Sequence, residues 1–253
     1  MIVLPHTSTM LQFARSPNGL KHTKHLPSER WVIMTVAQQE IEQAILDCFK
    51  SAEVVGQPYK HWFLSDCLPQ SSLKEICELP FPAPDLEGKS GKREVHNATR
   101  RYFDADNRAQ HPVVEAVSQS FQSKTITSAV ESTFGTTLDG SYLRIEYAQD
   151  TNGFWLEPHT DLGVKLFTCL LYLSDVPSHK NLGTDIYNDD KSHAGRSPFS
   201  PNAAMVFVPS DITYHGFEPR TIEGVRKSLI INYVTDEWRA REQLAFPEQP
   251  IQH

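Results

Sequence analysis

Four apolar segments in the second half of the chain constrain the fold more than any other feature. Each is rich in β-branched and aromatic residues and is bounded by turn-forming residues, which predicts a buried strand. The segments are SYLRIEYA (141–148), VKLFTCLLYLS (164–174), AAMVFVPS (203–210) and RKSLIINYV (226–234). Successive strands of this kind favour a sheet sandwich or a barrel.

The first half of the chain has helical patterns instead. Apolar residues recur at helical spacing between Thr35 and Ser51, which predicts an amphipathic helix. Other segments with local signals are a strand at 59–69 and helices at 70–79, 112–123 and 127–135. The stretch 80–94 is rich in proline, glycine and charge and predicts a loop. The expected fold class is therefore mainly β (α+β), with N-terminal helices packed outside a β core.

The length suits a single domain. A chain of 253 residues and 28.7 kDa fits one domain of the larger β-rich kind. Residues 1–33 contain one acid, Glu29, and have no sustained periodicity. They are expected to be a flexible tail, an organelle-targeting segment or an extension upstream of Met34. The domain is accordingly predicted at 34–253, with its β core at about 140–238.

Composition excludes several classes of protein. The formal net charge is -7 and the pI is near 5.9, so no global basic field favours nucleic acid or an anionic membrane surface. No apolar run approaches the roughly 20 residues that span a bilayer, and no secretory signal is visible. The four cysteines have no framework spacing and are expected to be free thiols, which fits a soluble, cytoplasmic protein.

His159 and Asp161 stand one residue apart, immediately before the second apolar segment. The flanking Pro158, Thr160 and Gly163 are turn-forming residues, so the pair has a simple interpretation as a turn. An imidazole and a carboxylate are also two of the three ligands of the 2-His-1-carboxylate triad that holds Fe(II). The metal interpretation requires a second histidine farther along the chain.

The required histidine is His215, which follows the third strand segment, and Arg226 opens the fourth. Two imidazoles and a carboxylate leave three positions on the metal for a bidentate cosubstrate and O2. The planar guanidinium of Arg226 matches a carboxylate in bidentate fashion. Separately, His215 could be a turn histidine and Arg226 could cap a strand. Their order and their framing by strands favour the metal site.

These residues resemble a known family, the Fe(II)- and 2-oxoglutarate-dependent dioxygenases, and within it the prolyl-hydroxylase-like branch. The resemblance runs from about 141 to 238, through EPHTD, TCLLYLSDV, LGTDIY and HGFEPRTIEGVRKSLIINY. The family folds as a double-stranded β-helix, a jelly-roll barrel with iron near one open end. It couples decarboxylation of 2-oxoglutarate to oxidation of a second substrate by O2.

The resemblance implies a role for eight residues. His159, Asp161 and His215 would bind Fe(II), and Arg226 would bind the distal carboxylate of 2-oxoglutarate. Tyr172 matches a tyrosine that joins this arginine, Tyr147 matches one that faces the iron, and Thr168 and Ser228 match neighbours of the cosubstrate. Both tyrosines also suit a plain interpretation as core aromatics. Leu156 and Arg226 depart from the tyrosine and lysine common in this branch, so a prolyl substrate is not implied.

Several other polar residues are candidates for contact with substrate. Lys165 is expected to extend to the rim of its strand or to meet an anionic group. Arg100 and Arg101, beside the predicted loop, suit an anionic substrate group or a solvated face. The remaining substrate-side candidates are Trp155, Arg144 and Asn232.

The predicted activity is hydroxylation of an unactivated C–H bond of a small molecule, with release of succinate and CO2. The expected cofactors are Fe(II), 2-oxoglutarate and O2, and no nucleic acid or membrane partner is expected. Two alternatives stay open: a non-catalytic jelly-roll binding module and a cupin-like metalloenzyme that does not use 2-oxoglutarate.

Overall fold

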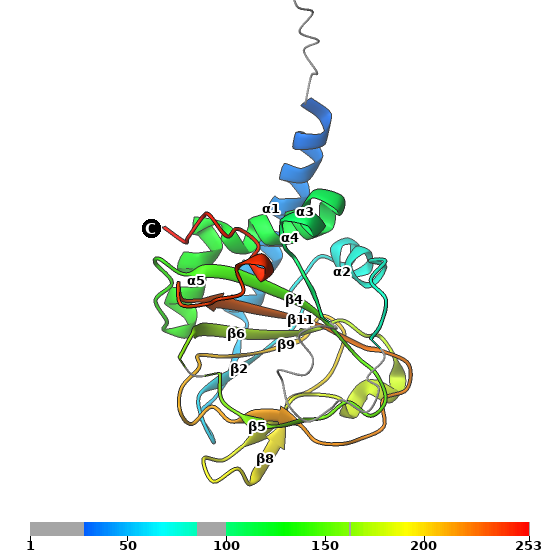
Figure 1. Ribbon diagram of the computed structural model, residues 1–253, viewed down its shortest axis with the longest axis vertical. Helices are drawn as coiled ribbons and strands as arrows, with labels where there is room; N and C mark the ends of the chain where they lie inside the picture. Colours follow the sequence, from blue (N-terminus) through cyan, green and yellow to red (C-terminus); the bar gives the residue numbers. More distant parts are fainter. Residues whose placement is uncertain (1–27, 85–99, 162, 253) are drawn as a thin grey trace, which may run out of the picture.

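The computed structural model describes residues 28–84, 100–161 and 163–252. Figure 1 shows three layers, with helices above a large sheet and a smaller sheet below it. The large sheet is antiparallel and has the spatial order β1 (Glu53–Val55), β2 (His61–Leu64), β9 (Ala204–Phe207), β6 (Lys165–Tyr172), β11 (Arg226–Val234), β4 (Tyr142–Asp150) and β3 (Arg101–Tyr102). The small sheet has the order β5 (Leu156–His159), β10 (His215–Phe217), β7 (Asp185–Tyr187) and β8 (His193–Arg196).

Local sequence signals account for the helices. The α-helices are α1 (Ser28–Lys50), α2 (Gln70–Cys77), α3 (Ala105–Gln110), α4 (Pro112–Gln122) and α5 (Lys124–Phe134), and short 3-10 helices are η2 (Pro177–Asn181) and η3 (Arg241–Gln243). The Asp104 carboxylate accepts from the backbone N–H of Asn107 and caps α3. Pro112 occupies the first turn of α4, and α5 ends at Gly135 in the left-handed conformation with φ of 76°.

The two faces of the large sheet have different neighbours. On β4, Leu143, Ile145 and Tyr147 point into an apolar core with the helices. Arg144 and Glu146 alternate with them and point to the space between the sheets, as the period of two requires. One face therefore builds the core and the other builds a polar interior.

A β-bulge interrupts this alternation at the start of β6. Tyr233 pairs with Phe167 whereas Val234 pairs with Lys165, so Leu166 is an extra residue in the ladder. Because the bulge shifts the alternation by one residue, Leu166 packs toward the helix core and Lys165 turns to the other face. Lys165 is consequently buried and does not extend to the rim.

Most sequence predictions for secondary structure are confirmed. Each expected strand and helix is present, although α1 begins seven residues before the predicted Thr35, and helix α3 and several short strands were not expected. The large sheet extends beyond the predicted core of 140–238, because it also includes β1, β3 and β2, and β2 corresponds to the strand predicted at 59–69. Helix α1 begins at Ser28, inside the predicted tail, whereas residues 1–27 and most of the predicted loop 80–94 lie outside the described residues.

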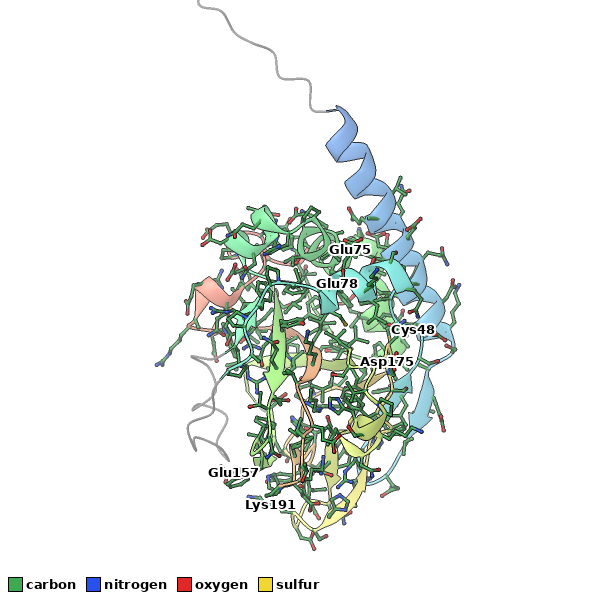
Figure 2. The ribbon with its side chains drawn as sticks, turned by 90° about the vertical axis from the view of Figure 1, so that its right-hand side faces the viewer. Cys48, Glu75, Glu78, Glu157, Asp175 and Lys191 are labelled. Atoms are coloured by element: carbon green, nitrogen blue, oxygen red, sulfur yellow. The ribbon has the colours of Figure 1, made fainter. Side chains whose placement is uncertain are left out.

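The cysteines are free thiols, as predicted. Figure 2 shows α1 along one edge of the molecule, with Cys48 near the end that meets the sheets. Its Sγ lies 3.2 Å from Sγ of Cys67. None of the described helices is long and apolar enough to cross a membrane.

A candidate metal centre beside a polar cavity

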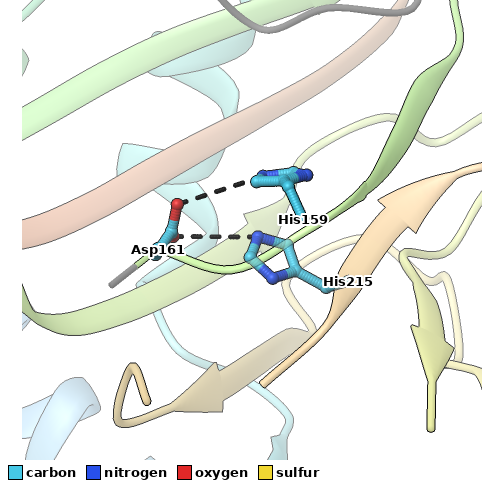
Figure 3. Close-up of side chains that lie close together, drawn as sticks. All are labelled: His159, Asp161 and His215. Atoms are coloured by element: carbon cyan, nitrogen blue, oxygen red, sulfur yellow. Dashed lines mark ion pairs between the residues drawn. The ribbon is translucent and has the colours of Figure 1, made fainter. Parts of the chain in front are cut away.

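His159, Asp161 and His215 come together between the two sheets (Figure 3). Nε2 of His159 lies 4.0 Å from Oδ1 of Asp161, and Nε2 of His215 lies 3.7 Å from Oδ2 of the same carboxylate. The two imidazole centroids are 4.3 Å apart. His159 ends β5 and His215 opens β10, where they are direct partners in the antiparallel register. Sheet pairing thus brings together two residues that are far apart in the sequence.

Both histidines are oriented as metal ligands are. Nδ1 of His159 lies 2.9 Å from the Glu157 carbonyl, and Nδ1 of His215 lies 3.0 Å from the Thr213 carbonyl. A carbonyl only accepts, so Nδ1 carries a proton and Nε2 is the nitrogen that faces Asp161, which is the atom a metal would bind in the neutral imidazole. Burial and, to a smaller extent, the nearby His159 lower the pKa of His215 to about 3, against the raising effect of Asp161. His215 is therefore neutral at pH 7, the form that binds metal.

The carboxylate of Asp161 is held from the side of the sheet. The hydroxyl of Thr168 donates to Oδ2 at 3.0 Å, and Nζ of Lys165 lies 2.8 Å from Oδ1. Thr168 in turn accepts from the side-chain amide of Asn232 at 3.0 Å. Contacts of this kind orient a ligating carboxylate. Two imidazoles and one fixed carboxylate fit the donor set of a non-haem Fe(II) site.

Gly216 allows β5 and β10 to approach closely at this point. A Cβ at this position would lie 2.7 Å from the Leu156 carbonyl oxygen and 3.1 Å from that of Glu157. Any side chain would therefore push the backbone of β5 away. The close approach holds His159 opposite His215.

The triad opens into a polar cavity between the sheets. The cavity has a volume of about 70 Å³, counted as space for the centres of water molecules. Its charged lining comprises three carboxylates, Glu146, Asp150 and Asp161, and three cations, Arg100, Lys165 and Arg226. The apolar lining includes Phe154, Leu156, Leu170, Phe217 and Ile230.

Arg226 lines this cavity, but part of its guanidinium is already engaged. Nε donates to the Leu182 carbonyl at 2.7 Å, and Nη1 donates to Oδ2 of Asp150 at 2.6 Å. Nη2 has no hydrogen-bond partner among the described residues. Since each planar edge of the guanidinium includes an engaged nitrogen, the fully open fork expected from the sequence is not present.

A chain of buried polar contacts joins Arg226 to Asp161 across the sheet. Each member contacts the next through hydrogen bonds or ion pairs, in the order Arg226, Asp150, Arg100, Glu146, Arg144, Asn232, Thr168 and Asp161. Burial by itself opposes the charge of Arg100, and Glu146 and Asp150 raise its pKa above the ordinary arginine value. The interior is thus polar but largely compensated.

Of the three residues predicted beside the cosubstrate, only Ser228 lines the cavity. Ser228 lines the cavity, and Thr168 contacts Asp161 rather than the cavity. The ring of Tyr172 lies 5.6 Å from the Arg226 guanidinium, while its hydroxyl contacts Thr184 at 2.9 Å and Ser197 at 2.5 Å. The position of Tyr172 is compatible with a neighbour of Arg226, but its hydroxyl is occupied by other partners.

The expectation that Tyr147 faces the metal is wrong. Tyr147 shares a face of β4 with Leu143 and Ile145, and its ring packs on Phe81 at 5.5 Å, in the helix-side core. Burial raises its pKa. Its hydroxyl has no partner among the described residues. The plain interpretation as a core aromatic holds, because the alternation of β4 turns Glu146 to the cavity instead.

Of the remaining predicted substrate-side residues, one lines the cavity, two lie behind it and two lie elsewhere. Arg100 lines the cavity, whereas Arg101 is exposed and Trp155 has 36% exposure. Arg144 and Asn232 lie in the polar chain behind the cavity. Sequence reasoning missed Glu146 and Asp150, although charges that alternate with apolar residues in LRIEYAQD were a signal of a polar interior face.

A second group of possible ligands, Asp185, His193 and Glu218, is an ion-pair cluster. Asp185 contacts Arg196 at 2.6 Å and Arg220 at 2.7 Å. The two guanidiniums already neutralise the carboxylate that a cation would need.

Solved structures show where this fold occurs. The chain is similar to a structure described as prolyl 4-hydroxylases from Phytophthora capsici, with 15% identity over 86% of this chain and 69% of that chain and a TM-score of 0.51. It is also similar to a prolyl hydroxylase from Trichoplax adhaerens in complex with a hypoxia inducible factor oxygen degradation domain peptide fragment, with 13% identity over 85% of this chain and 97% of that chain and a TM-score of 0.51. No protein-family model and no curated protein matches the chain. The chain therefore has a prolyl-hydroxylase-like fold.

Proposed function

We propose that the protein is an Fe(II)- and 2-oxoglutarate-dependent oxygenase with a double-stranded β-helix core. The observation that carries the proposal is the triad of His159, Asp161 and His215, with both Nε2 atoms directed at one carboxylate and an arginine in the same cavity. The catalytic domain is assigned to residues 34–253, with the core at about 140–238. The segment 1–33 is assigned no part in the chemistry.

The chain's own residues divide the work. His159, Asp161 and His215 would hold the metal, which when bound supplies the chemistry that converts 2-oxoglutarate, O2 and R–H into succinate, CO2 and R–OH. Thr168 keeps the Asp161 carboxylate in position. The apolar lining of Phe154, Leu156 and other side chains limits the access of water.

Arg226 would bind the distal carboxylate of 2-oxoglutarate, with Ser228 and Tyr172 as neighbours. An incoming carboxylate reaches Nη2 directly, but a bidentate pair requires Asp150 to release Nη1. Asp150 has an alternative cation at hand, because its other oxygen lies 3.7 Å from Nη2 of Arg100. A small movement of Asp150 toward Arg100 would open Arg226 without leaving a buried carboxylate unpaired.

The substrate class assigned to the site is a small molecule, since the cavity between the two sheets is compact. The second candidate is a peptide, and it is favoured by the shared fold of the Trichoplax adhaerens enzyme, which binds a peptide fragment. Both substrates would present a C–H bond to the same metal site.

The test is iron-dependent succinate release from 2-oxoglutarate by the full chain. We expect release that requires added Fe(II), is lost with a chelator, and is lost in His215→Ala while His193→Ala retains it. His193 is the matched control because it lies on the small sheet outside the cavity. Metal binding without conversion of 2-oxoglutarate would favour the cupin-like alternative, and absence of metal binding would favour the binding module.

A further inference from the structure

Arg100 has unused hydrogen-bonding capacity in the cavity. A guanidinium has five N–H donors. Nη1 of Arg100 lies 2.8 Å from Oε1 of Glu146, and Nη2 lies 3.7 Å from Oδ1 of Asp150, beyond hydrogen-bond range. Its other close contact among the described residues is the ring of Phe154, 5.9 Å from the guanidinium carbon. Most of its donors therefore remain available to a ligand.

The position of this arginine makes those donors significant. The side chain of Arg100 is only 10% exposed, and it lines the same cavity as the triad and Arg226. Buried N–H groups of a guanidinium that lack acceptors are costly unless a ligand supplies them. The next residue, Arg101, is exposed.

Charges in the cavity favour an anion as that ligand. Its described lining has three carboxylates and three cations, and Arg144 stands directly behind with its Nη2 2.6 Å from Oε2 of Glu146. Adding Arg144 to this count gives four cations against three carboxylates, a net charge of +1 among the described residues. The proposed Fe(II) and dianionic 2-oxoglutarate would add no net charge.

We propose that Arg100 binds a carboxylate group of the substrate that is oxidised, which makes this substrate a small carboxylic acid. The inference rests on the proposed function, in which Arg226 binds the cosubstrate. Asp150 lies between the two arginines and separates two anion sites, one at Arg226 and one at Arg100. Glu146 holds Nη1 of Arg100, and a movement of Asp150 onto Nη2 would still leave the Nε–H and one N–H on each terminal nitrogen for the ligand.

The experiment uses the full chain loaded with Zn(II) and saturating 2-oxoglutarate, which occupies the Arg226 site. Propionate is the probe and propionamide is its neutral counterpart, and saturation-transfer NMR measures binding of each. We expect saturable binding of propionate and none of propionamide. Arg100→Gln should weaken propionate binding about ten- to a hundredfold, Arg100→Lys should weaken it less, and Arg101→Gln should leave it unchanged.

Arg100→Lys retains the positive charge beside Glu146, so it provides a folded variant if Arg100→Gln melts early in circular dichroism. No saturable propionate binding, equal binding of propionamide, or binding that survives both Arg100 variants overturns the inference. Affinity for 2-oxoglutarate is measured in the same samples. Failure of the wild-type chain to bind 2-oxoglutarate defeats the proposed function together with this inference, whereas normal 2-oxoglutarate binding without an Arg100-dependent site defeats the inference alone.

Discussion

The two faces of the large sheet differ more than any other two regions of the molecule. Toward the helices, β4 and β11 present apolar side chains such as Ile145, Leu229 and Ile231. Toward the small sheet, the same strands present Glu146, Arg226 and other charged residues. Neighbouring residues of one strand therefore face an apolar core and a polar cavity in turn, and substitutions on the two faces should have separable effects.

The two faces also contribute differently to the free energy of folding. Apolar burial on the helix side contributes about 25 cal/mol for each Å² removed from water. A buried network of arginines and carboxylates stabilises little, because desolvation offsets most of the attraction between the charges. The polar face is thus better explained by binding than by stability.

The largest expected effect is a loss of activity when residues on the polar face are substituted. His159→Ala, Asp161→Ala and His215→Ala should each abolish succinate release, because each removes one ligand of the proposed triad. The melting temperature of the metal-free chain should barely change, since the helix-side core stays intact. Metal content and thermal unfolding of each variant measure the two properties. A variant that retains near wild-type activity and iron would exclude that residue as a ligand.

A substitution on the helix side should do the reverse. Leu229 is fully buried there, and Leu229→Ala should lower the free energy of unfolding by about 2–5 kcal/mol. Metal affinity of the folded fraction should remain unchanged. Denaturant unfolding and a metal titration below the transition test both statements. A large loss of metal affinity in the folded state would show that the faces are coupled.

Arg226 and Lys227 are adjacent on β11 and point to opposite faces of the sheet, so substitutions at the two positions test the two faces directly. Arg226→Ala should raise the apparent 2-oxoglutarate constant about ten- to several hundredfold, and Arg226→Lys should raise it less. Lys227 points the other way and donates to the Cys77 carbonyl at 2.8 Å, so Lys227→Ala should leave the constant unchanged. The assay is a 2-oxoglutarate titration of succinate release with iron content. An unchanged constant in Arg226→Ala would remove the case for 2-oxoglutarate.

Thr168 should affect the metal without touching it. Thr168→Val preserves shape but removes the hydroxyl that donates to Asp161, and metal affinity should fall about ten- to a hundredfold. Thr127→Val is the control, because Thr127 is equally buried in α5 on the helix side. Competition with a chelator measures both affinities. Equal affinity in the two variants would mean that Asp161 does not depend on Thr168.

Tyr147→Phe should have the smallest effect. The hydroxyl has no described partner, so its removal should change the free energy of unfolding by less than about 1 kcal/mol, in the stabilising direction. Kinetic constants should match the wild type. A marked loss of activity with normal stability would show that Tyr147 contributes to the proposed site.

Much of the fold was predictable because long strands carry a clear alternation. The segments at 141–148 and 226–234 correspond to β4 and β11, and Asp161 lies shortly before β6, as its position in the sequence indicated. The short strands β5, β7, β8 and β10 were not predicted, since three or four residues give no periodic signal. Their pairing is nevertheless what places His159 opposite His215.

The remaining differences come from which face of a strand is turned inward. Alternation in β4 shows that Tyr147 shares a face with Ile145, but the resemblance alone had directed it to the metal. Lys165 could not be placed, because a one-residue bulge is set by the partner strand and not by local sequence. Ion pairs such as Arg226 with Asp150 join residues far apart in the chain and become visible only when the register is known.

Gly216 shows that the proposed metal site depends on a residue with no side chain at all. The hydrogen that replaces a Cβ there gives β5 the room to bring its histidine within reach, and a Cβ would lie 2.7 Å from a backbone oxygen. A change of Gly216 to alanine could therefore silence the site while every proposed ligand remained in the sequence. For an evolving lineage, this position would offer a one-step route from the proposed metal-dependent enzyme to a metal-free descendant that keeps the same fold. A search for lost activity in related chains should examine this glycine as closely as the histidines.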